Sequence, residues 1–444
     1  MTKNSKAALL AALMIGTGGL VLSQPAMAKK EEAAAPKLSQ AFVKAASAAQ
    51  TAIAAKNWDA ASASLEEAKK LATNDDENLV VNQLGLNLEN NKLLAATNGD
   101  AAAYQAQRIS LLPYVNGLID NPKTPPADKL KLLDSRADMF YKGKRYKEAI
   151  ADYEALRAGG NADVNVTLRI AQAKYFLGDV DGMLAEMQKA IVGEKAAGRA
   201  VPKEWYDYVI PRLFSANRVK ETADWASALV HAYPSPAAWR QWCFTYMKLL
   251  GDDAKPDYEK RIDLYRLVRA SGGLAGNADY VQYAFAADKL GISSETKAVL
   301  SEGRASGKVP ASDPDANRLM GIATASFAAE KPFDVQIKAA KASKSGDLSW
   351  QTADLLLGAG KYAEAADLYR DALSKPAGPK TARSATPDDI NTHLGIALAL
   401  SGDKAGAASA FKAVTGTPRS EIAKFWLTWL DIGSGSAAAK TAAS

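Results

Sequence analysis

The sequence predicts an all-α protein made of stacked helix pairs, and three observations carry this prediction. Similar helix–turn–helix segments recur along the chain. In four of the five segments, the second helix places a small side chain four residues before a larger one. Loops rich in glycine and proline fall between the helices in the same register. The recurring segments are residues 52–72, 139–159, 174–191, 350–376 and 398–418.

The first 28 residues have the features of a secretory signal peptide. Two lysines precede an apolar stretch of 16 residues, and Ala26-Met27-Ala28 supplies a cleavage site of the Ala-x-Ala type. We expect cleavage after Ala28 and a periplasmic location. The next residue is Lys29 rather than cysteine, so no lipid anchor is indicated. Residues 29–37 form a low-complexity linker, and the predicted folded body begins at residue 38.

The spacing in the second helices has a physical cause. A small side chain lets two antiparallel helices approach, and the large one, a turn further along the same face, fills the groove between them. The small positions are Ala61, Ala149, Ala365 and Ala407, and the large ones are Leu65, Tyr153, Tyr369 and Phe411. Met183 and Met187 occupy both places in the remaining copy. Intervals of 34 and 42 residues separate neighbouring copies, which is typical of helix-pair solenoids.

With these pairs, the chain resembles the tetratricopeptide repeat family. The resemblance also rests on small residues in the first helices, on the turns Gly178-Asp179, Gly360-Lys361-Tyr362 and Gly402-Asp403, and on the closing Pro376 and Pro418. Those small residues are Ala137, Ala171, Ala353 and Gly395. The resemblance implies a right-handed α-solenoid of about ten antiparallel helix pairs over residues 38–432.

The match to the tetratricopeptide repeat pattern is closer in some parts of residues 38–432 than in others. Clear repeats cover 38–72, 130–192 and 347–431, and the match is degenerate over 200–345. There Thr222 takes a small position and Pro211 is expected to interrupt a first helix. Segments beginning at residues 260, 293 and 333 are expected to be further second helices. Residues 433–444 are too poor in large apolar side chains to fold and form a tail.

The tetrapeptide Gly358-Ala359-Gly360-Lys361 raises the question of nucleotide binding. A phosphate-binding loop of the Walker type needs a glycine and a serine or threonine where this chain has Leu355 and Tyr362. The preceding segment also lacks the β-branched residues of a buried strand. The tetrapeptide is therefore interpreted as a turn between helices, and no cofactor is expected.

Other candidate catalytic residues have ordinary structural explanations. Ser294 and Lys297 match a Ser-x-x-Lys pattern, but Ser293 or Ser294 would serve as a helix N-cap and no clear Lys-Thr-Gly partner follows. His231 can bond the last carbonyls of its helix, and His393 lies in a first helix without an obvious metal or nucleophile partner. The single cysteine, Cys243, has apolar neighbours that indicate burial. With two histidines and one cysteine, a zinc site has almost no ligands available, and the chain is expected not to be an enzyme.

Charge and hydropathy limit the classes of partner that the chain is expected to bind. The formal charge of +6 would fall to +4 without the two lysines of the signal peptide, and both signs are spread along the helices. Nucleic acid is therefore not an expected partner. No segment of the mature chain is apolar for long enough to span a membrane.

Eight tryptophan and tyrosine residues are concentrated between Trp205 and Tyr246. At helical spacing such side chains usually fill the core, although a groove lined by them would also suit a peptide or a glycan. The eight are Trp205, Tyr206, Tyr208, Trp225, Tyr233, Trp239, Trp242 and Tyr246.

The resemblance also implies where a partner binds, because the first helix of each tetratricopeptide repeat lines the concave groove. Matching that pattern residue by residue gives the candidate partner-binding residues Lys131, Asp134, Asp138, Tyr141, Lys142, Asn165, Gln172, Tyr175 and Arg240.

These observations predict a non-enzymatic periplasmic adaptor that holds envelope proteins together. Its layout resembles repeat proteins associated with TonB-type energy transduction, without a motif specific to them. One alternative is a polysaccharide-export scaffold with a glycan as ligand. Another is a relative of the superhelical lytic transglycosylases, although those enzymes carry a catalytic domain after the superhelix and this chain ends in repeats and a tail.

Overall fold

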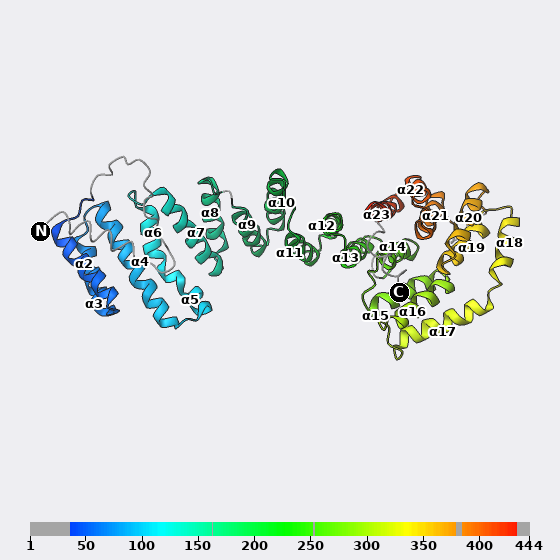
Figure 1. Ribbon diagram of the computed structural model, residues 1–444, viewed down its shortest axis with the longest axis horizontal. Helices are drawn as coiled ribbons and strands as arrows, with labels where there is room; N and C mark the ends of the chain where they lie inside the picture. The colour runs from blue at the N-terminus through cyan, green and yellow to red at the C-terminus, as the bar shows by residue number, and fades with distance from the viewer. Residues whose placement is uncertain (1–35, 162, 252–253, 379–383, 433–444) are drawn as a thin grey trace. The chain divides into compact units, whose positions relative to one another are not determined.

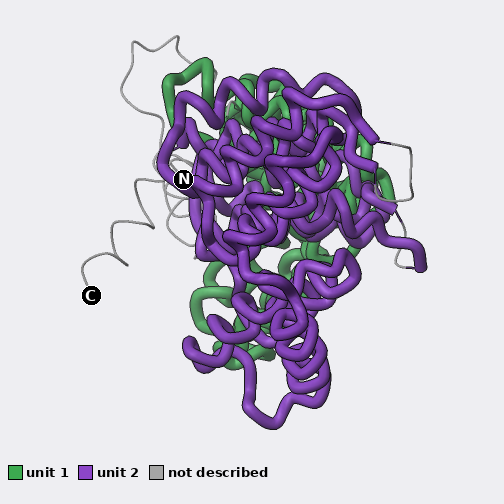
Figure 2. The backbone as a smooth tube through the Cα atoms, turned by 90° about the vertical axis from the view of Figure 1, so that its right-hand side faces the viewer, with its two compact units in different colours: residues 1–201 green, residues 202–444 purple. Residues whose placement is uncertain are grey.

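A computed structural model describes residues 36–161, 163–251, 254–378 and 384–432. Throughout these ranges every regular element is a helix (Figure 1). The all-α class predicted from the sequence is therefore confirmed. The predicted signal peptide, most of the linker over 29–37 and the tail over 433–444 lie outside the described residues. The chain divides into two compact units, one up to Val201 and one from Pro202 (Figure 2), and the predicted domain boundaries stay a prediction.

The first unit consists of helix pairs, with an insertion in the second pair. Its elements are α2 (Gln40–Ala54), α3 (Trp58–Leu71), α4 (Asp75–Thr97), α5 (Ala101–Gln107), the 3₁₀ turn η1 (Arg108–Leu111), α6 (Leu112–Asp120), α7 (Pro126–Lys142), α8 (Tyr146–Ala158), α9 (Val164–Phe176) and α10 (Val180–Ala196). Consecutive helices pack against each other, as short connections between antiparallel helices require.

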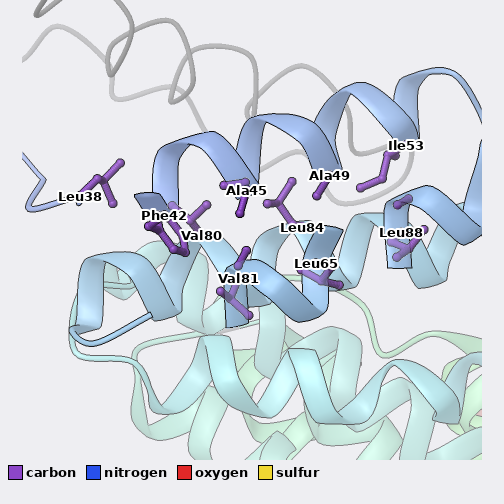
Figure 3. Packing of buried hydrophobic residues seen from close by; sticks show 13 residues of the cluster. Leu38, Phe42, Ala45, Ala49, Ile53, Leu65, Val80, Val81, Leu84 and Leu88 are labelled. Carbon is purple, nitrogen blue, oxygen red and sulfur yellow. The ribbon is translucent and has the colours of Figure 1, made fainter. Parts of the chain in front are cut away.

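The first pair shows how these helices form and pack. The side chains of Ser39 and Asn57 accept hydrogen bonds from backbone N–H groups in the first turns of α2 and α3. Phe42 of α2, Leu65 of α3 and Leu84 of α4 are buried together in one apolar cluster (Figure 3). The alternation of alanine with larger side chains thus brings three helices into one core.

The small and large positions predicted in the second helices are all buried. This holds for Ala61 and Leu65 of α3, Ala149 and Tyr153 of α8, and Met183 and Met187 of α10. It holds equally for the two later copies, Ala365 with Tyr369 and Ala407 with Phe411. The interpretation of this spacing as a helix-packing signal is confirmed.

The second unit continues the pairing through the degenerate region. Its helices are α11 (Lys203–Ser215), α12 (Val219–Ala232), α13 (Pro236–Met247), α14 (Tyr258–Ala270), α15 (Asn277–Lys289), α16 (Ser293–Ala305), α17 (Pro314–Ala329), α18 (Phe333–Ala342), α19 (Asp347–Gly358), α20 (Tyr362–Ser374), α21 (Pro387–Ser401), α22 (Lys404–Lys412) and α23 (Arg419–Ile432). Among the described residues of both units, ten pairs run from α2/α3 to α21/α22, and α23 follows them.

Pro211 does not interrupt its helix, contrary to the sequence prediction. Helix α11 runs through it from Lys203 to Ser215. A proline inside a helix leaves the carbonyl four residues earlier without its partner, which here is that of Asp207. Asp207 and Pro211 are both exposed, so solvent can hydrate that carbonyl. The missing bond therefore costs less than it would in the core.

The tetrapeptide at 358–361 joins two helices, as predicted. Helix α19 ends at Gly358 and α20 begins at Tyr362. Gly360 has φ +75°, a left-handed conformation that glycine adopts without steric cost, and Lys361 N–H donates to the Leu356 carbonyl at 2.8 Å. The glycine closes the helix and lets the chain reverse.

The second unit also folds back on itself. Helix α14 packs against α21 and α23, and α16 packs against α19 (Figure 1). Contacts of this kind are additional to the neighbour-to-neighbour packing of a helical repeat. Trp426 of α23 is buried, and its indole N–H donates to the Asp263 carbonyl of α14 at 3.2 Å.

None of the described helices is both long and apolar enough to cross a membrane.

Candidate partner-binding site

A groove in the second unit is formed by the first helices of three successive pairs, together with α14. It has a volume of about 720 Å³. Its lining combines basic, acidic and aromatic side chains. The lining residues that carry the argument are Arg240 and Phe244 of α13, Tyr258 and Tyr265 of α14, Asp279, Gln282 and Phe285 of α15, and Asp315 and Arg318 of α17.

Arg240 and Asp279 form a fixed ion pair in this groove. The guanidinium donates through Nε and Nη2 to the two carboxylate oxygens, both at 2.7 Å. Asp279 also accepts from the Ala275 N–H at 2.8 Å. Burial opposes ionisation of Asp279, but the hydrogen bonds from Arg240 and the Ala275 backbone outweigh it and hold the pKa of the carboxyl below its usual value.

The pair presents one side to the groove. The Asp279 side chain is 6% exposed, whereas that of Arg240 is 41% exposed and lies 4.7 Å from the centre of the Phe244 ring. Asp279 therefore holds the Arg240 guanidinium from its buried side. The outer face of the guanidinium remains open to an acceptor from a partner.

Aromatic rings form the apolar part of the groove. Phe244 and Tyr265 meet edge to face with centres 5.7 Å apart, and Tyr258 meets Phe285 in the same way at 5.9 Å. Tyr265 is also stacked on the fully buried Tyr283 at 5.3 Å. Burial raises the pKa of Tyr265 to about 12, so its hydroxyl stays protonated at neutral pH. These contacts fix the rings before any partner binds.

Of the nine residues predicted to bind a partner, only Arg240 lies in this groove. The other eight lie on α7 and α9 of the first unit. Several of them contact one another there or pair with near neighbours. Tyr141 donates to Gln172 Oε1 at 3.1 Å, Lys142 pairs with Asp138 at 3.5 Å, and Asp134 pairs with Arg169 at 3.2 Å. The remaining members are Lys131, Asn165 and Tyr175. Lys131 pairs with Asp128, and Tyr175 meets Phe176 edge to face. The backbone N–H and the Nδ2 group of Asn165 donate to Asp163, which is the N-cap of α9.

Sequence reasoning missed most of the groove because α14 and α17 belong to the degenerate repeats. The signal that was available is aromatic content, since Phe244, Tyr258, Tyr265 and Phe285 recur on consecutive helices. Their separation along the chain hides the fact that they share one hollow.

The aromatic segment between Trp205 and Tyr246 is largely core. Trp205, Tyr206, Trp239 and Trp242 are each at most 7% exposed. Trp242 stacks on Phe425 of α23 with ring centres 3.8 Å apart. Cys243 is fully buried, and burial raises the pKa of its thiol. Four of the eight aromatic side chains are thus buried in the core, as the core interpretation predicted, and Tyr208, Trp225, Tyr233 and Tyr246 are half-buried.

A buried charge cluster holds the fold-back of the second unit. His393 Nδ1 lies 2.7 Å from Asp354 Oδ1, and its Nε2 makes an ion-pair contact of 3.3 Å with Asp263 Oδ1 that is not aligned as a hydrogen bond. Asp263 also contacts the guanidinium groups of Arg266 and Arg419. Burial alone would lower the pKa of His393, but the two carboxylates raise it to about 10.

The cluster joins four helices, α14, α19, α21 and α23, and it was not foreseen. Its members are far apart in sequence, and His393 has no partner in its own segment. Each acid is compensated by a cation, which is the arrangement that buried charges require. We therefore interpret the cluster as structural.

The Ser294 hydroxyl is engaged in packing. It donates to the Leu355 carbonyl of α19 at 2.8 Å, and the Ser293 hydroxyl donates to Glu330. Neither serine caps α16, contrary to the sequence prediction, because the N-cap position is Ile292. Lys297 lies 5.3 Å from the centre of the Phe327 ring. His231 Nδ1 lies 2.8 Å from the Ser227 carbonyl, one turn before the last carbonyls of α12, which were its predicted partners.

No family model matches the chain, and no curated protein matches it. Among solved structures it is similar to a tetratricopeptide repeat protein from Parabacteroides merdae, with 11% identity, a TM-score of 0.28, and coverage of 67% of this chain and 98% of the other. It is also similar to the apo form of RapI, with 11% identity, a TM-score of 0.33, and coverage of 75% of this chain and 96% of the other. For the maize pentatricopeptide repeat protein PPR10 the identity is 15% and the TM-score 0.28, with coverage of 96% of this chain and 66% of the other. All three TM-scores lie below 0.5, so the assignment of a tetratricopeptide-like helical-repeat fold rests on the packing of this chain itself.

Proposed function

We propose that this chain is a non-enzymatic adaptor that binds a segment of a partner protein in the groove of the second unit. The observation that carries the proposal is the groove itself, in which exposed arginines surround a fixed aromatic floor. Aromatic and arginine side chains are the residue types that contribute most binding energy at protein interfaces. Backbone amides and carbonyls of an extended segment could pair with Arg240, Gln282 and Asp315.

The compartment and the pathway are part of the same proposal. The signal peptide predicted over residues 1–28 supports export to the periplasm. The layout of a signal peptide followed by repeats supports envelope proteins, including those of TonB-type energy transduction, as the first partners to test. The burial of Trp205, Tyr206, Trp239 and Trp242 weighs against a glycan platform built from that segment.

The groove can be tested by filling it. Ala278 is an exposed residue of α15 that lines the groove, so Ala278→Trp should block it without altering the core. Ala363→Trp places the same side chain on the exposed face of α20, outside the groove lining, and is the matched control. Each variant would be crosslinked in an envelope extract and the products identified by mass spectrometry.

We expect a defined envelope protein to crosslink to the unaltered chain and to Ala363→Trp, and to be lost from Ala278→Trp. If Ala278→Trp retains that protein, the groove is not its binding site. Retention of the chain on purified peptidoglycan, with no protein captured, would overturn the adaptor proposal.

A further inference from the structure

A second interaction surface lies at one edge of the first unit, where four aromatic rings form a connected cluster. We call it the aromatic edge, and it consists of Tyr141, Tyr146, Tyr175 and Phe176. Phe176 stacks on Tyr146 with ring centres 5.0 Å apart and an interplanar angle of 16°. Tyr141 meets Tyr146 edge to face at 5.6 Å and Phe176 at 6.3 Å. The rings are thus held in place by one another.

Phe176 contributes little to the core of its own unit. Its side chain is 51% exposed, and the adjacent Leu177 is 43% exposed. In the preceding pair the corresponding residue is Lys142, since Lys142 precedes Ala149 by the same interval as Phe176 precedes Met183. Packing of the repeat therefore does not require an apolar residue here. Adjacent exposed apolar side chains on a fixed ring cluster are typical of a contact surface.

The chain beside these rings is strongly basic. The segment from the end of α7 to the start of α8 contains Lys142, Lys144, Arg145 and Lys147, interleaved with Tyr141 and Tyr146. All four cations are exposed. Lys142 pairs with Asp138, and Arg145 pairs with Glu148 at 2.9 Å. Within the described residues Lys144 and Lys147 have no ion-pair partner, so this segment carries positive charge that is not neutralised.

Acidic residues close to Phe176 and Leu177 in sequence limit what can bind. Asp179 is the N-cap of α10, and Asp181 lies in the first turn of that helix. A uniformly anionic lipid surface would attract the lysines but repel these two carboxylates. A peptide can place each charge separately, with carboxylates against Lys144 and Lys147 and an apolar side chain against Phe176.

We propose that the aromatic edge docks a protein segment in which an aromatic or leucine anchor is flanked by several carboxylates. The anchor covers Phe176 and Leu177, and the carboxylates pair with Lys144 and Lys147. This surface is separate from the groove of the second unit, and the proposal does not depend on the groove having a ligand.

The test uses fluorescent synthetic peptides of nine residues and the purified chain. One peptide has a central phenylalanine and leucine flanked by aspartate and glutamate, a second has lysine in place of each acid, and a third has alanine in place of the two apolar residues. Binding is followed by fluorescence anisotropy at low and high salt. Vesicles of anionic phospholipid are tested by co-sedimentation.

We expect the acidic peptide alone to bind, more weakly at high salt because the charged contacts are exposed. Phe176→Ser should weaken binding about tenfold, which corresponds to the loss of about 1.4 kcal/mol at an apolar contact. Phe214→Ser is the matched control, since Phe214 of α11 is also 51% exposed. Lys144→Glu/Lys147→Glu should weaken binding and reduce its dependence on salt, whereas Ala278→Trp should leave it unchanged.

Three results would overturn the proposal. The first is no binding of the acidic peptide at concentrations up to about 1 mM, beyond which an interface of this kind has no useful affinity. The second is equal weakening by Phe176→Ser and Phe214→Ser. The third is co-sedimentation with anionic vesicles that Phe176→Ser abolishes, which would assign the edge to a membrane surface.

Discussion

Gly395 and Phe411 show how one side chain controls the approach of two helices. Both lie in the α21/α22 pair, and Phe411 is buried in the position that holds a large residue in the second helix of each clear repeat. A Cβ atom on Gly395 would come within 2.5 Å of the Phe411 ring. The sequence contains this information locally, as a small residue in one helix and a large one in the next. For this reason the helix pairs could be predicted from the sequence.

Substitution of Gly395 by alanine should therefore destabilise the second unit. We expect a loss of about 1–3 kcal/mol, the usual cost of overpacking a core. Gly321→Ala is the matched control, because Gly321 lies inside α17 with open space around it, and alanine there should stabilise the helix by up to about 1 kcal/mol. Urea unfolding of both variants measures the difference. Equal stabilities would show that α21 and α22 are not packed as closely as described.

Helix α23 illustrates what the sequence did not reveal at the scale of elements. Its apolar residues predict a helix, but nothing in them indicates that it packs on α14. Beside the Trp426 indole, that contact involves Arg419, whose Nε donates to Asp389 at 2.6 Å and whose guanidinium also contacts Asp263 and the Glu259 carbonyl. Ion pairs between distant segments have no periodicity in sequence. The groove shares this difficulty, because its lining comes from four helices.

Removal of the Arg419 charge should release α23 from α14. Arg419→Met leaves Asp389 without its cationic partner and removes one of the three cations around Asp263, and we expect a loss of about 3 kcal/mol. Hydrogen exchange over residues 419–432 should become fast before the rest of the unit opens. Lys424→Met removes a cation from the exposed face of the same helix, where Lys424 pairs only with Glu421 at 2.7 Å, and should change little. Similar exchange rates in the two variants would contradict the role given to Arg419.

At the scale of the whole chain, the two units differ in how they respond to pH. Both histidines of the sequence, His231 and His393, belong to the second unit. The ordinary pKa of histidine near 6.5 applies to the unfolded chain, and the pKa of His393 is raised to about 10 in the folded one. Between these values the folded state keeps a proton that the unfolded state has released. The stabilisation is complete below pH 6.5 and is lost as pH rises toward 10.

Calorimetry at pH 7 and pH 9 should resolve this difference. We expect two unfolding transitions, one for each unit, and a lower Tm at pH 9 for the transition of the second unit. His393→Gln should lower that transition at pH 7 and remove most of its change between the two pH values. His231→Gln, at an exposed helix end, should leave the change intact. A single transition that shifts equally in all variants would contradict the division into two units.

The contact between Arg419 and Asp263 spans 156 residues, and this distance along the chain has a consequence for how the protein is made. Helical repeats ordinarily gain their contacts locally and can fold as synthesis proceeds. The first unit has this option, because each of its pairs is completed by the next. Asp263, by contrast, remains without two of its partners until residues 393 and 419 have been added. The second unit must therefore stay incomplete while more than a third of the chain emerges, and during that interval Trp242 of α13 lacks Phe425 of α23, the ring on which it stacks in the folded unit.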